Sequence, residues 1–432
     1  MKRILSIVIA AVLAANFVFG ADDSNDSQKK IKTGFNIGPL PAISYSTERG
    51  LQLGALADMY FYGDGKIFPK YYHKFNVEVS YYTKGSMNLH MFYDSQFLIP
   101  GIRFSTAVSY IPDTMNDFYG FNGDMAVFDP ELGKFKETYH IRKNMFRAIV
   151  DFQGPIGSDD SRLKWVAGLN FFNYRIEDCK GADNALADAN SVYRKYVNAG
   201  IIPENQKNGG NMLDIKAGLV FDTRDHEAAP NKGVCAELIL IGSFIGKNNP
   251  GYLNVMAHWR QYISLVKNRL VFAYRLAYQG NLAGETPWYA LNNVYTSYFR
   301  QVRTDGIGSQ NTIRGMYRNR LTALGVAWAN FEFRVRLFDF RLIKQYWYVA
   351  ANAFFDMGYI TQTYHKDQML SAAALGTYPL IADTEQKLHY STGAGLKLCM
   401  NYNFIISFEL AKALREQDGG KLNSIIQINY IF

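Results

Sequence analysis

Apolar and polar residues alternate along most of this chain, in segments of about ten residues. The alternation is plainest at 75–81, 270–279, 329–337 and 426–432. In the third segment Phe331, Phe333 and Val335 occupy one parity, and Glu332 and Arg334 occupy the other. Successive side chains of a strand point to opposite faces, so a period of two gives each strand one apolar and one polar face.

Continued along the chain, the alternation predicts roughly sixteen strands, an even number as in single-chain bacterial barrels, with ends placed to within about three residues. The expected strands cover residues 35–47, 51–61, 72–83, 86–97, 102–111, 139–151, 163–176, 212–222, 234–244, 252–264, 269–280, 325–337, 347–359, 387–400, 402–412 and 422–432.

Two all-β folds have one wet and one apolar face, a soluble sandwich and a membrane-spanning barrel. The apolar faces here are strongly aromatic, in a chain with 30 Tyr and 30 Phe. A barrel exposes such faces to lipid, whereas a sandwich would have to bury them all in one core. No stretch after residue 20 reaches the ~18 apolar residues of a membrane helix. We therefore expect a transmembrane antiparallel β-barrel.

The lengths of the connections support this count. Barrels of this kind have short periplasmic turns and long outer loops. With both termini in the periplasm, odd-numbered connections face outward. The four longest gaps, 112–138, 177–211, 281–324 and 360–386, all fall at odd-numbered connections.

The N-terminus predicts export. Lys2 and Arg3 precede an apolar run from Ile4 to Phe19, which is typical of a signal peptide cut before Ala21. An uncleaved membrane anchor is the alternative. We expect a signal peptide at 1–20, a short periplasmic linker at 21–34, and a barrel at 35–432 in the outer membrane of a Gram-negative bacterium, in contact with its lipids.

The net charge and the cysteine and histidine residues bear on which classes of function we expect. The net charge of +8 falls to +6 without Lys2 and Arg3, and no basic stripe indicates a nucleic-acid partner. Cys179, Cys235 and Cys399 are far apart, so a disulfide and three free thiols both remain open. The seven histidines lack a nucleophile motif, so we expect no enzyme, no cofactor and no metal.

Residues 312–317, Thr-Ile-Arg-Gly-Met-Tyr, lie in the longest outward loop. They resemble the VRGF/Y loop tip of the Omp85 superfamily (bacterial surface antigen D15, BamA-like barrels), with one extra residue before the aromatic. The resemblance implies that this loop folds into the barrel and that Arg314, Gly315 and Tyr317 form its tip. The alternative is that Arg314 is solvated in an outer loop.

The same resemblance supplies acidic partners on the two strands that follow. Glu332 and Asp356 match the family's wall residues, and both lie on the water-facing parity. A guanidinium inside a lumen needs carboxylates, because an unpaired buried charge costs several kcal/mol. We therefore expect Arg314 to pair with both.

A second motif, Asp222-Thr223-Arg224-Asp225 followed by Pro230 and Gly233, is similar to the family's DTRD…P…G segment. The resemblance implies a periplasmic turn, and Asp, Pro and Gly are turn-forming residues in their own right. A metal bound by Asp222, Asp225, His226 and Glu227 is the alternative.

The final segment places Tyr430 and Phe432 on the lipid side of the last strand. It resembles the signal by which the assembly machinery recognises barrel clients, a feature of any outer-membrane barrel.

Omp85 barrels insert other outer-membrane proteins or pass polypeptides across the membrane. Typical members carry periplasmic POTRA domains, and residues 22–33 are too few for one, so we expect a POTRA-less member with a periplasmic or lipoprotein partner and protein clients. Pro39 and Pro41 would weaken the seam between first and last strands, unless that strand begins at Ala42. The alternatives are a surface-exposed barrel without insertase activity and a passive pore.

Overall fold

A computed structural model describes residues 31–46, 49–68, 70–135, 137–179, 191–227, 229–267, 269–293, 306–342, 345–376, 380–400, 404–428 and 430–432. The expected signal peptide and most of the expected linker lie outside these residues. The described part contains a single 16-stranded antiparallel sheet in which each strand pairs with its neighbour in sequence. The strands are β1 (Phe35–Ser46), β2 (Gly50–Phe61), β3 (His73–Tyr82), β4 (Met87–Ile99), β5 (Ile102–Asp117), β6 (His140–Pro155), β7 (Leu163–Asp178), β8 (Asn211–Asp222), β9 (Gly233–Ile245), β10 (Tyr252–Val266), β11 (Leu270–Gly284), β12 (Gly325–Leu342), β13 (Gln345–Gln362), β14 (His389–Met400), β15 (Phe404–Ala413) and β16 (Leu422–Ile428).

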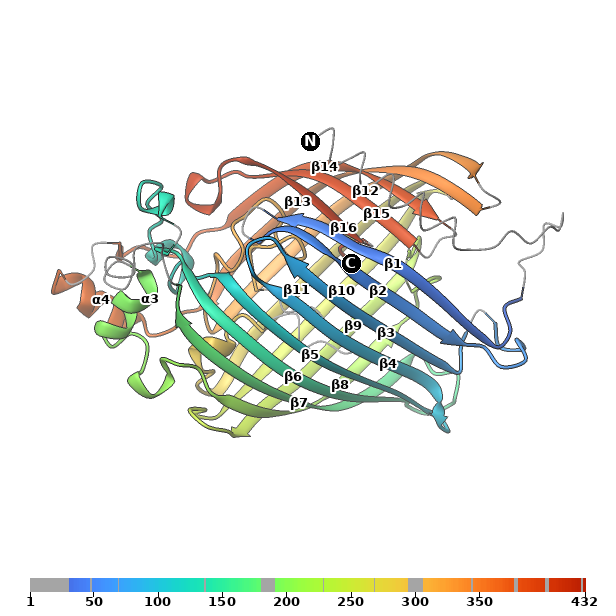
Figure 1. Cartoon of the computed structure of the whole chain (residues 1–432), viewed down its shortest axis with the longest axis horizontal. Helices are drawn as coiled ribbons and strands as arrows, with labels where there is room; N and C mark the ends of the chain where they lie inside the picture. Colours follow the sequence, from blue (N-terminus) through green and yellow to red (C-terminus); the bar gives the residue numbers. More distant parts are fainter. Residues whose placement is uncertain are drawn as a thin grey trace.

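The sheet curls round until β1 lies beside β16, which gives the molecule the shape of a tilted barrel (Figure 1). The expected fold class is confirmed. Most strands begin and end within a few residues of the expected positions, but several are longer towards the outer loops, where β5 continues to Asp117.

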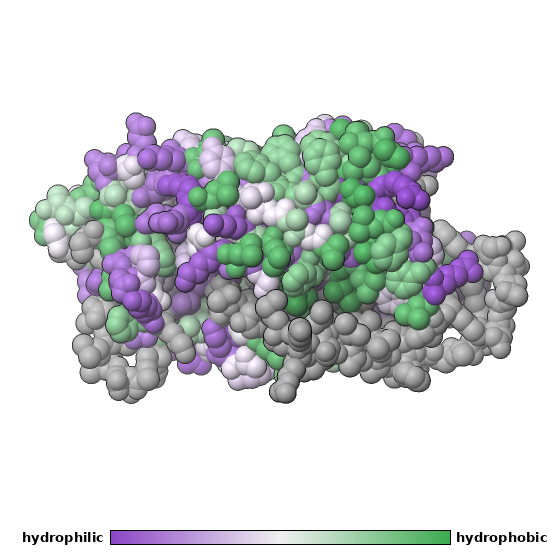
Figure 2. All heavy atoms as spheres, turned by 90° about the horizontal axis from the view of Figure 1, so that it is seen from above, coloured by the Kyte–Doolittle hydropathy of each residue, from purple (hydrophilic) through white to green (hydrophobic). Residues whose placement is uncertain are grey.

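Side chains alternate between the outside and the inside of the barrel. On β12, Phe333 and Val335 are 50% and 37% exposed, whereas Asn330 and Glu332 are fully buried inside. Hydrophobic side chains gather over the strands, and hydrophilic ones lie towards the ends (Figure 2). No helix among the described residues is long and apolar enough to cross a membrane.

The four longest connections join β5 to β6, β7 to β8, β11 to β12 and β13 to β14, and they lie at one end of the barrel (Figure 1). Two of them carry the helices α3 (Val192–Asn198) and α4 (Lys366–Ala374). Short 3₁₀ turns lie at Gly123–Met125, Leu132–Lys134, Glu204–Gln206, Trp288–Ala290 and Glu416–Asp418. The expected division between long outer loops and short turns is thus confirmed.

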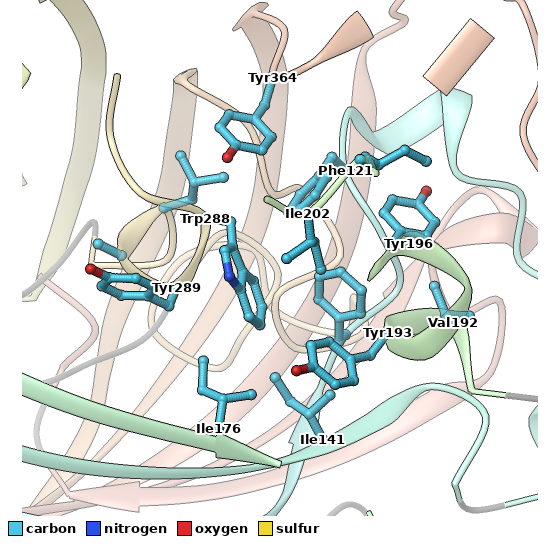
Figure 3. Packing of buried hydrophobic residues seen from close by; sticks show 14 of the residues in the cluster. Phe121, Ile141, Ile176, Val192, Tyr193, Tyr196, Ile202, Trp288, Tyr289 and Tyr364 are labelled. Carbon is cyan, nitrogen blue, oxygen red and sulfur yellow. The ribbon is translucent and has the colours of Figure 1, made fainter. Parts of the chain in front are cut away.

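These four loops pack against one another over the outer mouth, and we call this assembly the cap. Its core is aromatic, with the Trp288 ring at 5.6 Å from Phe118 and 5.7 Å from Tyr193 between ring centroids (Figure 3). Phe121 of the first loop packs edge-on against Tyr364 of the last, at 4.7 Å. The cap therefore has a hydrophobic core of its own above the polar lumen.

The first and the last strand each differ in extent from one of the expectations. Pro39 and Pro41 lie within β1, opposite Ala57 and Ala55 of β2, so the reading in which this strand begins at Ala42 is wrong. The last strand ends at Ile428, not at residue 432. Cys179, Cys235 and Cys399 are all buried free thiols.

Candidate functional site

The candidate site is the part of the β11–β12 loop that lies inside the barrel. Residues 306–324 form it, and Ile313 and Arg314 are completely buried. Ile313 and Met316 belong to a hydrophobic cluster that also contains Ile239 and Met256 of the wall. The loop tip therefore lies inside the barrel, which disagrees with a solvated Arg314.

Arg314 is held most closely by Asp356 on β13. Its Nε and Nη2 donate to the two carboxylate oxygens, each at 2.9 Å, and its backbone N–H donates to Oδ2 at 3.1 Å. The guanidinium carbon lies 3.4 Å from the centroid of the Phe354 ring. A planar guanidinium is suited to this two-point pairing and to stacking on a ring, whereas an ammonium group is not.

Glu409 on β15 is the second close carboxylate, with Oε1 3.1 Å from Nη1 of Arg314. The same oxygen accepts from Nζ of Lys397 and from the amide of Asn352, each at 2.8 Å. Glu332 is farther from Arg314, at 3.8 Å, and lies 3.3 Å from Arg334. Three carboxylates thus meet three cations, so the buried charges compensate one another.

Gly315 brings the loop against β15 and β16. Its φ of +79° favours glycine, and an added Cβ would lie 2.7 Å from the backbone of Ala411. Its carbonyl accepts from the amide of Asn423 at 3.1 Å. The Tyr317 ring stacks on Tyr119 of the cap at 5.4 Å. These contacts fix the loop tip between the wall and the cap.

Two further arginines of this loop reach other parts of the barrel. Arg318 donates to Asp113 at 2.9 Å and to Asp117 at 2.8 Å, near the outer end of β5. Arg320 donates to backbone carbonyls of the β5–β6 and β15–β16 loops. The loop is therefore bound both to strands of the wall and to two of the other loops.

The second motif forms the connection between β8 and β9. Asp222 accepts from the Arg224 side chain at 2.7 and 3.0 Å. Asp225 Oδ1 accepts from the backbone of Asn231 at 2.9 Å and of Lys232 at 3.2 Å. Gly233 has a φ of +107°. The residues therefore make a turn, as expected.

That turn does not gather the four residues proposed as metal ligands. Asp222 pairs with Arg224, and Asp225 accepts from the backbone of the turn. Pro230 is buried beneath the turn. Within the described ranges, no group of three or more His, Cys, Asp or Glu side chains is placed to hold a metal ion.

Tyr430 and Phe432 do not face lipid, so the expected orientation is wrong. Their rings lie 4.2 and 5.0 Å from the guanidinium of Arg334, inside the barrel, and Phe432 also lies 5.1 Å from that of Arg275. The β15–β16 ladder stops at Ile428, so alternation no longer governs the following residues. The attraction between cations and aromatic faces accounts for the inward position.

Comparisons with known proteins agree with this geometry. The Omp85 superfamily domain matches residues 71–430. BamA from Haemophilus ducreyi lacking POTRA domains 1–3 has a similar structure, with 15% identity, a TM-score of 0.57, and coverage of 98% of this chain and 78% of that one. CdiB from Escherichia coli aligns with 10% identity and a TM-score of 0.56, over 92% of this chain and 62% of its own length. No curated protein matches.

The strand order and the lipid-facing apolar wall define an outer-membrane β-barrel, filled by an inward loop. The chain belongs to the Omp85 superfamily.

Proposed function

We propose that this barrel assists the insertion or translocation of other outer-membrane or surface proteins, together with a periplasmic or lipoprotein partner. Membership of the Omp85 superfamily supports the general class. The observation that carries the proposal is the composition of the seam, where β1 meets β16.

Pro39 and Pro41 supply no N–H donors. The β1–β2 ladder is regular over all twelve pairs, from Phe35↔Phe61 to Ser46↔Gly50. Proline is accommodated in a sheet where its nitrogen points away from the paired neighbour. We therefore assign the missing N–H donors to the edge of β1 that faces β16. β16 is a strand of only seven residues. A seam with few hydrogen bonds is one that can separate to admit a client strand.

The test is deletion of the gene, followed by quantification of all outer-membrane proteins. Reduced levels of particular barrels or surface proteins are expected, with restoration by the intact gene. Unchanged levels of every other such protein would contradict the proposal.

A second candidate is a surface-exposed barrel without insertase activity. The packed cap favours it, because an ordered outer surface could make contacts with other cells or molecules. The same deletion separates the two functions, since a contact protein predicts altered surface binding with normal levels of the other outer-membrane proteins.

A further inference from the structure

A small cavity of 140 Å³ lies at the periplasmic end, beneath the β8–β9 turn. We call it the arginine pocket. Its wall residues come from the start of β11, from β12, from β13 and from the chain after β16, and the turn contributes Ala229, Pro230 and Asn231. The second sequence motif therefore forms one side of a cavity as well as a turn.

Positive charge dominates this pocket. Arg269, Arg334 and Arg336 all line it. Arg336 pairs with Asp339 at 2.5 Å, and Arg334 lies 3.3 Å from Glu332. Glu332 also lies 3.8 Å from Arg314, so Arg334 shares this carboxylate with the Arg314 cluster.

Arg334 is incompletely satisfied although it is only 5% exposed. Its Nη2 donates to the carbonyl of Phe432 at 3.0 Å, but its Nε and Nη1 are buried and have no hydrogen-bond acceptor among the residues that the structure describes. The Tyr430 ring lies 4.2 Å above the guanidinium. A buried donor without an acceptor costs about 1–3 kcal/mol, more for a charged group, so an anion that reached Nε and Nη1 would gain those donors.

The size and the lining of the pocket select the ligand. Its volume equals that of about four to five water molecules, which is enough to admit the side chain of aspartate or glutamate. Val271, Ala350 and the Tyr348 ring line it beside the arginines. Such a mixed surface suits a carboxylate on an aliphatic stem better than a fully hydrated inorganic ion.

We propose that the arginine pocket binds an acidic side chain of a polypeptide segment that enters from the periplasm, in competition with the Tyr430 ring. The proposal rests on the proposed function only in taking the ligand to be a polypeptide. Arg269 at the exposed rim attracts the carboxylate, and Arg334 receives it when the ring moves aside.

The experiment measures binding of a fluorescent ten-residue peptide, blocked at both ends, to the whole chain in detergent at low salt. One peptide carries a single Glu, and its partner carries Gln at the same place. The Glu peptide is expected to bind about tenfold more tightly, because a charge-assisted hydrogen bond contributes about 1.5–3 kcal/mol. Inorganic phosphate at equal concentration is expected to compete poorly.

Three variants locate the binding. Arg269→Gln is expected to weaken it about threefold, as for an exposed charge pair, and Arg162→Gln, an exposed arginine in the β6–β7 turn, is the matched control with no effect. Tyr430→Leu is expected to tighten binding because the competing ring is gone.

Equal affinity for the Glu and Gln peptides would overturn the proposal, as would an Arg269→Gln variant that binds like the Arg162→Gln control. Competition by phosphate as strong as that by the Glu peptide would replace the acidic segment with a general phosphate ligand. Failure here together with lowered client levels in the deletion strain would refute the pocket alone. Normal client levels with intact Glu-peptide binding would refute only the proposed function.

Discussion

At the scale of single residues, Arg314 decides how the lumen is filled. It is fully buried and pairs with Asp356 and Glu409 on two different strands. Removal of one member of a buried ion cluster costs roughly 3–5 kcal/mol, because the remaining charges lose their compensation. The loop therefore depends on this side chain far more than on an exposed arginine.

We predict that Arg314→Ala loosens the inward loop and raises the ion conductance of the barrel in planar bilayers. Arg314→Lys keeps the charge but loses the two-point pairing, so its conductance should lie between those of Ala and wild type. Arg142→Ala, in an exposed pair with Glu177, is the control and should conduct like wild type. Wild-type conductance of the Arg314→Ala barrel would contradict the interpretation of the loop as a plug.

Gly315 permits a second prediction. Gly315→Ala introduces a Cβ 2.7 Å from the backbone of Ala411, whereas Gly157→Ala has a similar φ of +89° and nothing within 4 Å. Both variants carry the strain of a left-handed backbone, about 1 kcal/mol or more, but only the first displaces the loop. We expect raised conductance for Gly315→Ala alone. Equal conductance of the two variants would show that the close approach to β15 has no role.

The sequence predicted part of this site and missed part of it. The resemblance to the Omp85 superfamily identified Arg314, Glu332 and Asp356, and the water-facing parity of the two carboxylates agreed with it. Glu409 and Lys397 lie on inward positions of β15 and β14, but no local motif marks them as partners of Arg314. Their pairing depends on strands that are neighbours only after the barrel forms. Arg318 and Arg320 were missed for the same reason.

At the scale of elements, the cap joins loops that are distant in sequence. His365 precedes α4, and its Nε2 lies 3.1 Å from Glu285 of the β11–β12 loop. Its Nδ1 lies 2.7 Å from the carbonyl of Ile201 in the β7–β8 loop. One imidazole thus connects three of the four loops, and protonation allows both nitrogens to donate.

This contact should make the cap sensitive to pH. Burial lowers the pKa of His365, but the Glu285 carboxylate and the Ile201 carbonyl outweigh it and raise the pKa above its ordinary value. The hydrogen bond from His365 lowers the pKa of Glu285. The histidine therefore stabilises the cap fully below the ordinary pKa of about 6.5, and this contribution is lost as the pH rises through the raised value.

We predict that the protection factors of the amides in α3 and α4, which are corrected for the intrinsic pH dependence of exchange, are higher at pH 5.5 than at pH 8.5. His365→Gln should abolish most of this difference. His73→Gln, which removes a histidine bonded to the Tyr93 hydroxyl at the other end of the barrel, should leave it unchanged. An equal pH response in the His365→Gln variant would assign the effect to other groups.

The strands themselves were predictable, and the chain after β16 was not. Alternation reports which face a residue occupies as long as the ladder continues, as it does to Ile428. It carries no information about where a ladder stops. The positions of Tyr430 and Phe432 follow from Arg334 and Arg275, which belong to strands more than ninety residues earlier.

At the scale of the whole molecule, the contact between β1 and β16 at the seam can be changed while the ladders between strands that are neighbours in sequence are kept. Pro39→Val with Pro41→Val restores two N–H donors on β1. We predict that this pair strengthens the β1–β16 contact, raises the temperature at which the barrel unfolds in detergent, and lowers the levels of client proteins in cells. Pro100→Val, in the turn between β4 and β5, is the control and should leave client levels normal. A fully functional double variant would count against opening at the seam.

The cap also has a consequence for the order in which the parts of the barrel assemble. Asn122 donates a hydrogen bond to the backbone carbonyl of Tyr364, 242 positions away in the sequence. The four loops of the cap are likewise far apart in the sequence, from the β5–β6 loop to the β13–β14 loop. Contacts between such distant parts form slowly, because the chain between them must first be ordered. The strands are therefore expected to enter the bilayer before the cap has packed over the outer mouth. A newly inserted copy would pass through a leaky stage that the finished one does not have.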